Sequence, residues 1–124
     1  MDLVVTISEL AARLPSTEQF ELSRELRKSA VSIPSNVAEG QACGGKRYRN
    51  HVRFALGSLA ELDTQLEVTK RVKLLPAASL AAVERDVERT GKLLHGLSRS
   101  LRLRQLRDTA LGCVVMCVIL LLWS

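Results

Sequence analysis

The sequence predicts an all-α protein, built as an antiparallel up-down-up-down four-helix bundle with a short first helix and an apolar C-terminal tail. Three observations support this fold class. The 124 residues are rich in Leu, Ala and Val, and only 3% are aromatic, a composition that favours helices over strands. Apolar residues recur in steps of three and four along four segments. Short connections separate these segments, which makes neighbouring helices antiparallel.

The first segment covers residues 2–13. The pair Leu14-Pro15 ends it, because the residue before a proline is disfavoured in the helical region. Its apolar positions follow the i, i+3, i+4, i+7 spacing of a short amphipathic helix. They are Leu3, Val4, Ile7, Leu10 and Ala11.

The second segment begins with Ser16 as N-cap and Gln19 three residues later, a capping-box pattern. Gly40 and then Gly44-Gly45 end it. Pro34 lies inside this helix, where it frees the carbonyl of Ala30 and is expected to bend the rod. Ser35 or Asn36 is expected to compensate locally. The apolar stripe consists of Leu22, Leu26, Ala30, Ile33 and Val37.

The third and fourth segments carry the most regular stripes. In the third, apolar residues repeat at a and d positions over about three heptads. Pro76 interrupts the pattern before the fourth segment. The third stripe is Tyr48, Val52, Ala55 with Leu56, Leu59, Leu62, Leu66 and Thr69, and the fourth is Leu80, Val83, Val87, Thr90, Leu94, Leu97 and Leu101.

The net charge of +5 is unevenly distributed. Residues 41–60 and 89–107 contain ten of the 18 Lys and Arg residues and no acid, while the rest contains all 13 acids. An antiparallel bundle brings the start of the third helix and the end of the fourth to the same pole. This convergence predicts nucleic-acid binding, with RNA favoured, through phosphate contacts. The expected residues are Lys46, Arg47, Arg49, Arg53, Arg99, Arg102 and Arg104.

Two other interpretations of this surface remain open. A solvated polar face keeps any small protein soluble, and a basic surface can also contact an acidic protein partner in an assembly. None of the seven residues is aromatic, so binding to nucleic acid is expected to tolerate different sequences rather than to depend on base stacking.

Three stretches carry a family resemblance. They are RKSAVSIPSNVAEG at 27–40, RFALGSLAELDTQL at 53–66 and VERTGKLLHGLSRSLR at 87–102. Together they resemble the four-helix-bundle proteins encoded in intervening sequences of bacterial 23S rRNA genes, a family related to accessory variability proteins of diversity-generating retroelements. The resemblance covers about residues 3–104 and implies a homopentamer with no established enzymatic activity. Relative to that family, the first helix here is short by one or two turns, so a longer native N-terminus is an open question.

The motif residues are expected to pair the second and third helices. A hairpin that turns near residues 43–44 places Arg27 opposite Glu61 as a partly buried ion pair. It also places Ala30 opposite Gly57 and Ser58, where the small residues Ala30 and Gly57 allow close approach. Ile33 then faces Phe54, and Asn36 faces His51. The residues assigned this structural role are Arg27, Pro34, Asn36, Glu39, Gly40, Gly57, Ser58 and Glu61.

A catalytic or metal-binding interpretation of Asn36, Glu39, His51 and Glu61 is less favoured. The chain has only two His residues and no Glu-x-x-His pair, which di-metal bundle sites require. It also lacks phosphate-loop, zinc-protease and nucleophile–base motifs. We therefore expect no enzymatic activity, no metal and no cofactor.

The cysteines point to a cytoplasmic protein. Three cysteines, Cys43, Cys113 and Cys117, are an odd number without zinc-like spacing, and no signal peptide is recognisable. Cys113 and Cys117 share one helical face, where we expect them to act as small apolar side chains.

The last residues differ from the bundle, which is expected over 1–107. No charged side chain follows Asp108, and a helix over 109–124 would be about 24 Å long, short of the roughly 30 Å bilayer core. A membrane anchor flanked by Arg102, Arg104 and Arg107 is one interpretation. Burial in an oligomer interface or along the bundle and a non-native terminus are the others, and together they are favoured over membrane association.

Overall fold

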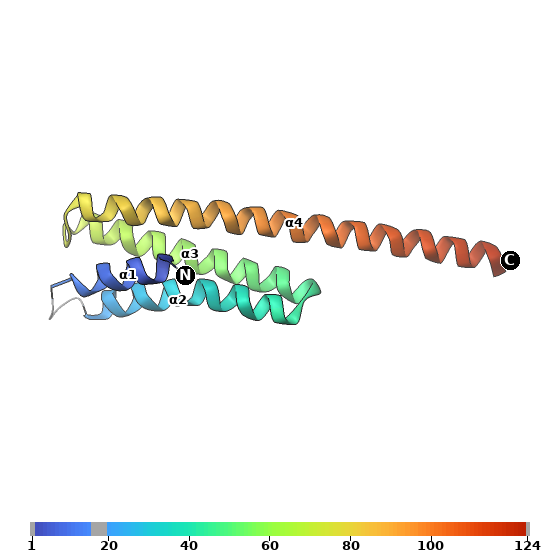
Figure 1. Ribbon diagram of the computed structural model, residues 1–124, viewed down its shortest axis with the longest axis horizontal. Coiled ribbons are helices and arrows are strands. Elements are labelled where there is room, and N and C mark those ends of the chain that lie inside the picture. The colour runs from blue at the N-terminus through green and yellow to red at the C-terminus, as the bar shows by residue number, and fades with distance from the viewer. Residues whose placement is uncertain (1, 16–19, 124) are drawn as a thin grey trace.

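The computed structural model describes residues 2–15 and 20–123, and within them it consists of four helices and no strand (Figure 1). The predicted all-α class is confirmed. The capping box expected at Ser16 and Gln19 lies outside the described residues. The helices are α1 (Asp2–Ala12), α2 (Phe20–Cys43), α3 (Gly45–Arg71) and α4 (Ala77–Trp123).

The helices pack as an antiparallel bundle. Helices α2 and α3 form a hairpin, α4 returns along α3, and α1 closes the ring by packing against α2 and α4. Because α1 has only 11 residues, it covers about half the length of α2. Between the N-terminal end of α1 and the α2–α3 turn, the bundle consists of α2, α3 and α4 alone (Figure 1).

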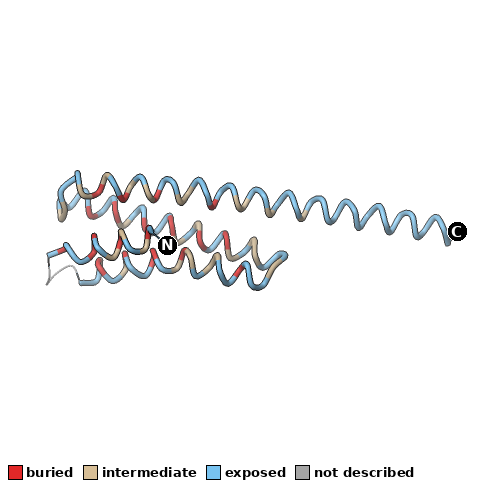
Figure 2. Tube along the Cα trace, in the orientation of Figure 1, coloured by how far each residue is buried: buried red, intermediate tan, exposed pale blue. Residues whose placement is uncertain are grey.

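The predicted apolar stripes form the core. Leu97 and Leu101 are only half-buried, so the core is concentrated where α1 completes the bundle (Figure 2). Each helix contributes buried apolar residues at the expected spacing. They are Leu3, Ile7, Leu10 and Ala11 of α1, Leu26, Ala30 and Ile33 of α2, Val52, Ala55, Leu59, Leu62 and Leu66 of α3, and Leu80, Val83, Val87 and Leu94 of α4.

The connection between α2 and α3 is tight, as the adjacent glycines Gly44 and Gly45 predict. Gly40 does not end α2, which continues to Cys43. The amide of Gly44 donates to the carbonyl of Gly40 at 2.9 Å. Gly44 and Gly45 have φ values of 69° and 53°, a left-handed conformation that glycine adopts without a steric cost. Only Gly44 lies between the two helices, and the positive φ values of Gly44 and Gly45 allow the chain to reverse there.

Helix α2 runs through Pro34. The side chains of Ser35 and Asn36 do bond backbone carbonyls here, as expected, but not the carbonyl of Ala30. Ser35 Oγ donates to the carbonyl of Val31 at 2.9 Å, and Asn36 Nδ2 donates to that of Ser32 at 2.9 Å. Both residues therefore make the local side-chain bonds to the backbone that were expected beside Pro34.

Helix α4 continues through the expected boundary at residue 108. It has 47 residues, which at 1.5 Å per residue makes it about 70 Å long. Every described residue from Leu106 onward is exposed, and the end of α4 projects past the α2–α3 turn (Figure 2). Burial of the tail along the bundle of its own chain is therefore wrong.

Candidate nucleic-acid interface

The two basic stretches meet at one end of the molecule. The guanidinium of Arg49 on α3 donates to the side-chain carbonyl of Gln105 on α4, across 56 residues of sequence. Each of the seven predicted residues lies within two helical turns of Arg49 or Gln105. We call this cluster the basic pole. It consists of Lys46, Arg47, Arg49, Arg53, Arg99, Arg102 and Arg104.

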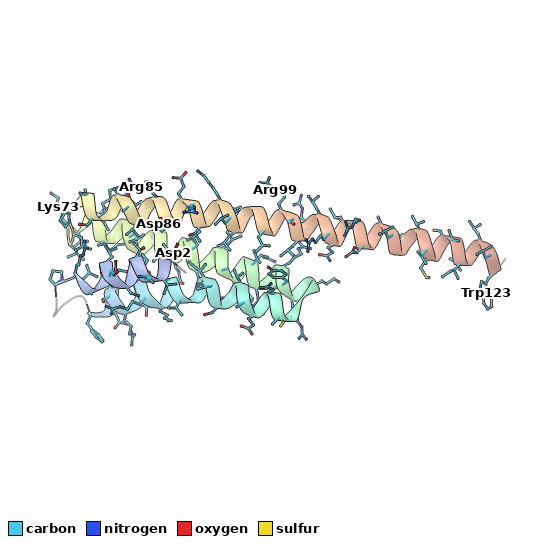
Figure 3. All side chains as sticks on the ribbon, in the orientation of Figure 1. Asp2, Lys73, Arg85, Asp86, Arg99 and Trp123 are labelled. Carbon is cyan, nitrogen blue, oxygen red and sulfur yellow. The ribbon has the colours of Figure 1, made fainter. Side chains whose placement is uncertain are left out.

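The side chains of the basic pole are available to a ligand. Six are exposed, and Arg49, which contacts Gln105, is half-buried. Arg99 points away from the bundle on α4 (Figure 3). Within residues 2–15 and 20–123, none of the seven forms an ion pair. Two carboxylates lie near this end: Asp108 is 3.8 Å from Arg107, and Glu39 is 3.9 Å from His51.

Basic residues farther from this pole are partly neutralised by acids. Lys70 and Glu84 lie 3.0 Å apart, and the hydrogen bond between them raises the pKa of Lys70. Hydrogen bonds from Arg71 and Lys92, each 2.7 Å long, lower the pKa values of Glu67 and Glu88. These three cations are therefore neutralised in part, whereas in the described chain none of the seven at the basic pole is.

A cleft of about 570 Å³ lies between the start of α3 and α4 at this pole. Tyr48, Arg49, Leu101, Arg104 and Gln105 line it together with Gly44 and Gly45. Half-buried Tyr48 thus lines the same cleft as two arginines. The sequence indicated Tyr48 only as a core residue, because it lies at the end of the apolar stripe.

Phe54 adds a second aromatic ring that the sequence interpretation missed. We expected it to lie opposite Ile33 inside the hairpin, but its side chain is 60% exposed and follows Arg53 directly. The His51 ring meets it edge to face with centroids 5.8 Å apart. The signal was present in the sequence, because Phe54 falls between the stripe positions Val52 and Ala55 and therefore on another face.

The motif residues form a polar contact between α2 and α3. Ser32 and Ser58 hydroxyls are 2.8 Å apart, and Asn36 Nδ2 donates to Ser32 Oγ at 3.1 Å. Since the amide nitrogen of Asn36 donates, its oxygen accepts from Nδ1 of His51, 3.2 Å away. Asn36 therefore contacts His51, as expected, whereas Ser58 bonds Ser32 rather than facing Ala30.

Gly40 provides the close helix approach that was assigned to Gly57. A Cβ atom at Gly40 would lie 2.7 Å from Cβ of His51 and 2.9 Å from Cδ2 of Tyr48. A Cβ atom at Gly57 would have no neighbour within 4 Å, and Gly57 is exposed. The expected contact of Gly57 with Ala30 is therefore wrong.

The expected buried ion pair of Arg27 and Glu61 is also wrong. Both residues are exposed, and the part of the chain that the structure describes holds no ion pair between them. The alternative acid–base cluster is only partly assembled, because Asn36, Glu39 and His51 lie together without Glu61. The described residues contain no group of three His, Cys, Asp or Glu side chains suited to a metal.

Replacing Asn36 by Ala is expected to lower the free energy of unfolding by about 1–3 kcal/mol, because it leaves Nδ1 of half-buried His51 without the Asn36 oxygen and removes one of the two side-chain bonds of Ser32, which keeps Ser58. Urea denaturation measures the change. Ser35→Ala is the control, since its exposed hydroxyl bonds only a carbonyl of its own helix, and its effect should stay within about 0.5 kcal/mol. Equal losses in both variants would contradict a pairing role for Asn36.

The sequence matches the family model described as 23S rRNA-intervening sequence protein over residues 1–96. The chain belongs to this family. Within the family match lie Lys46, Arg47, Arg49 and Arg53, whereas the arginines of the basic pole on α4 follow it.

A solved relative shares the fold. The crystal structure of an S23 ribosomal protein family member of unknown function from Bacteroides thetaiotaomicron superposes with a TM-score of 0.72. The two sequences are 22% identical, and the match covers 78% of this chain and 92% of the other. At that identity the likeness establishes the four-helix fold alone. No curated protein matches the sequence.

Proposed function

We propose that this chain is a non-enzymatic nucleic-acid-binding protein that holds RNA through the basic pole. The observation that carries the proposal is the convergence of seven basic side chains from α3 and α4 around the Arg49–Gln105 contact, without a neutralising partner in the described chain. The family description refers to 23S rRNA, so a fragment of that RNA is the first ligand to test.

The chemistry of the pole suits phosphates. Guanidinium groups donate paired hydrogen bonds to phosphate oxygens, and six of the seven side chains are free to reach a backbone that passes over the pole. Binding displaces condensed counterions from the RNA, which supplies most of the free energy in sequence-tolerant complexes. The exposed ring of Phe54 beside Arg53 offers one place where an unpaired base can stack.

Assembly would strengthen these contacts. We propose a homo-oligomer, with the pentamer of the family resemblance as the expected state. Large apolar side chains are exposed along the bundle, among them Val31 at 48%, Val68 at 44% and Leu93 at 67%. A ring of protomers multiplies the basic pole, so contacts that are weak singly add through multivalency. Light scattering on the full chain tests this state, and a monodisperse monomer at micromolar concentration would contradict it.

A salt titration of RNA binding tests the function. Fluorescence anisotropy with a labelled single-stranded RNA should give an affinity that falls as salt rises from 50 to 200 mM. For seven phosphate contacts per protomer the slope of log K against log salt is expected near about −5. Undetectable binding at low salt, or an affinity that does not change with salt, would reject the proposal.

A further inference from the structure

The last part of α4 is apolar on all its sides. We call residues 109–123 the apolar extension; it contains no charged side chain. From Leu111 to Leu120 its large side chains are 46% to 64% exposed. At 100° per residue, the consecutive residues Val114, Val115, Met116 and Cys117 point to four different sides. A helix of this kind normally lies in a protein interior or in a bilayer.

A bilayer fits this surface better than a second copy of the chain. A partner helix would cover one side of the extension and leave the apolar residues of the other sides in water. Lipid covers all sides at once. The sequence left burial along the bundle as an alternative, and the structure removes it, because the extension begins where the α2–α3 turn ends (Figure 3).

The dimensions are those of a short membrane span. Helix α4 contains an 18-residue window with a mean hydropathy of 1.9, and none of that window is buried. That window includes Arg107 and Asp108; the uncharged residues 109–123 alone span about 22 Å at 1.5 Å per residue, so a bilayer with a core of roughly 30 Å would thin locally around them. Trp123, 89% exposed at the far end, is a residue type that prefers the opposite interface.

The charges beside the extension match an anionic membrane surface. Arg102, Arg104 and Arg107 precede it on α4 and are exposed. Arginine side chains reach from a helix end to the headgroups. Gly44 and Lys46 line the same cleft as Asp108 and Thr109, so the start of α3 lies level with the first residues of the extension. The basic pole would therefore face the headgroups if the extension were inserted.

We infer that the apolar extension is a C-terminal membrane anchor that inserts into an anionic bilayer and seats the basic pole on its surface. This inference goes beyond the proposed function and does not rest on it, since the extension's own side chains carry it. Lipid headgroups and RNA would then compete for Arg102 and Arg104, which border the extension.

The three cysteines of the chain provide an internal test. All are exposed: Cys43 at the end of α2, Cys113 and Cys117 in the extension. The full chain is synthesised cell-free with vesicles of phosphatidylcholine and phosphatidylglycerol, floated on a gradient and treated with a membrane-impermeant maleimide. We expect the protein to float with the vesicles, with Cys43 labelled and the other two protected. Absence from the floating fraction would overturn the inference, as would protection of Cys113 and Cys117 without vesicles, the pattern of an interface between copies.

A full-chain variant tests the same inference without cysteine chemistry. Val115→Asp combined with Ile119→Asp places two charges in the middle of the extension, far from the bundle, so the fold should persist by circular dichroism. The floating fraction should fall by about tenfold or more, because a carboxylate near the bilayer centre is strongly disfavoured. Val115→Leu with Ile119→Leu is the matched control and should float like the parent chain. Equal flotation of both variants would overturn the inference.

Discussion

Neutralising three residues of the basic pole together, Arg47→Gln, Arg53→Gln and Arg102→Gln, is expected to lower RNA affinity by about 10- to 100-fold at 100 mM salt. Each substitution removes a phosphate contact, so the slope of the salt dependence should also become shallower by about 2 to 3 units. All three side chains are exposed, and the bundle should keep its stability. Fluorescence anisotropy measures both quantities on the same protein.

The matched control removes the same charge elsewhere. Arg13, Arg27 and Arg85 are exposed and form no ion pair within the described chain. Changing these three to Gln gives the same net charge as the pole variant, yet the affinity should change by no more than about threefold, because salt screens distant charges. Equal losses in the two variants would show that net charge governs binding rather than the basic pole.

Gly40→Ala should lower the free energy of unfolding by about 1–3 kcal/mol, the usual cost of overfilling a close contact. The new methyl group would lie 2.7 Å from Cβ of His51 and 2.9 Å from Cδ2 of Tyr48. His51 cannot yield cheaply, since its Cβ atom is held by its own backbone, and rotation of the Tyr48 ring gives only partial relief, since the Cα atom of Tyr48 would lie 3.3 Å away. Relief requires α2 and α3 to separate near their turn. Urea denaturation followed by circular dichroism measures the loss.

Gly57→Ala is the matched control, because it makes the same chemical change in the neighbouring helix. No atom lies within 4 Å of the added carbon, and alanine favours a helix over glycine by up to about 1 kcal/mol. This variant should therefore be as stable as the parent chain or more stable. A Gly40→Ala protein that is equally stabilised would contradict the close approach of α2 and α3 at this position.

The fold could be predicted because the apolar stripes have helical spacing and each stripe has one face to bury. The stripe residues Leu26, Leu62 and Leu80 are fully buried, as predicted. The short connections then left an antiparallel ring as the simplest packing. The same topology predicted where the two basic stretches meet, which the contact of Arg49 with Gln105 confirms.

Pair contacts between helices could be predicted only close to the turn. Counting back from the turn placed Asn36 against His51, and the structure agrees. Farther away, Ser29 bonds Gln65 rather than a residue near position 58. Residues that face a neighbouring helix recur every three or four positions. Pairing residues by equal distance from the turn therefore becomes less accurate along the hairpin. This is why the predicted pairing of Arg27 with Glu61 failed.

The course of α4 past the bundle could not be predicted from composition. An apolar segment has the same residues whether it packs on its own chain, on a copy or in lipid. Only the three-dimensional course of α4 shows that residues after Leu106 leave the bundle. The outward position of Phe54, in contrast, could be predicted, because Phe54 falls between the apolar stripe positions Val52 and Ala55 of α3.

Ultraviolet crosslinking shows directly whether RNA lies on the basic pole. The full chain is irradiated in complex with a uridine-rich RNA, digested, and the crosslinked peptides are identified by mass spectrometry. Crosslinks are expected in residues 45–54 of α3 and 99–107 of α4, both lost at high salt. Crosslinks confined to α1 or to the α3–α4 connection at the opposite end would contradict this placement of the RNA.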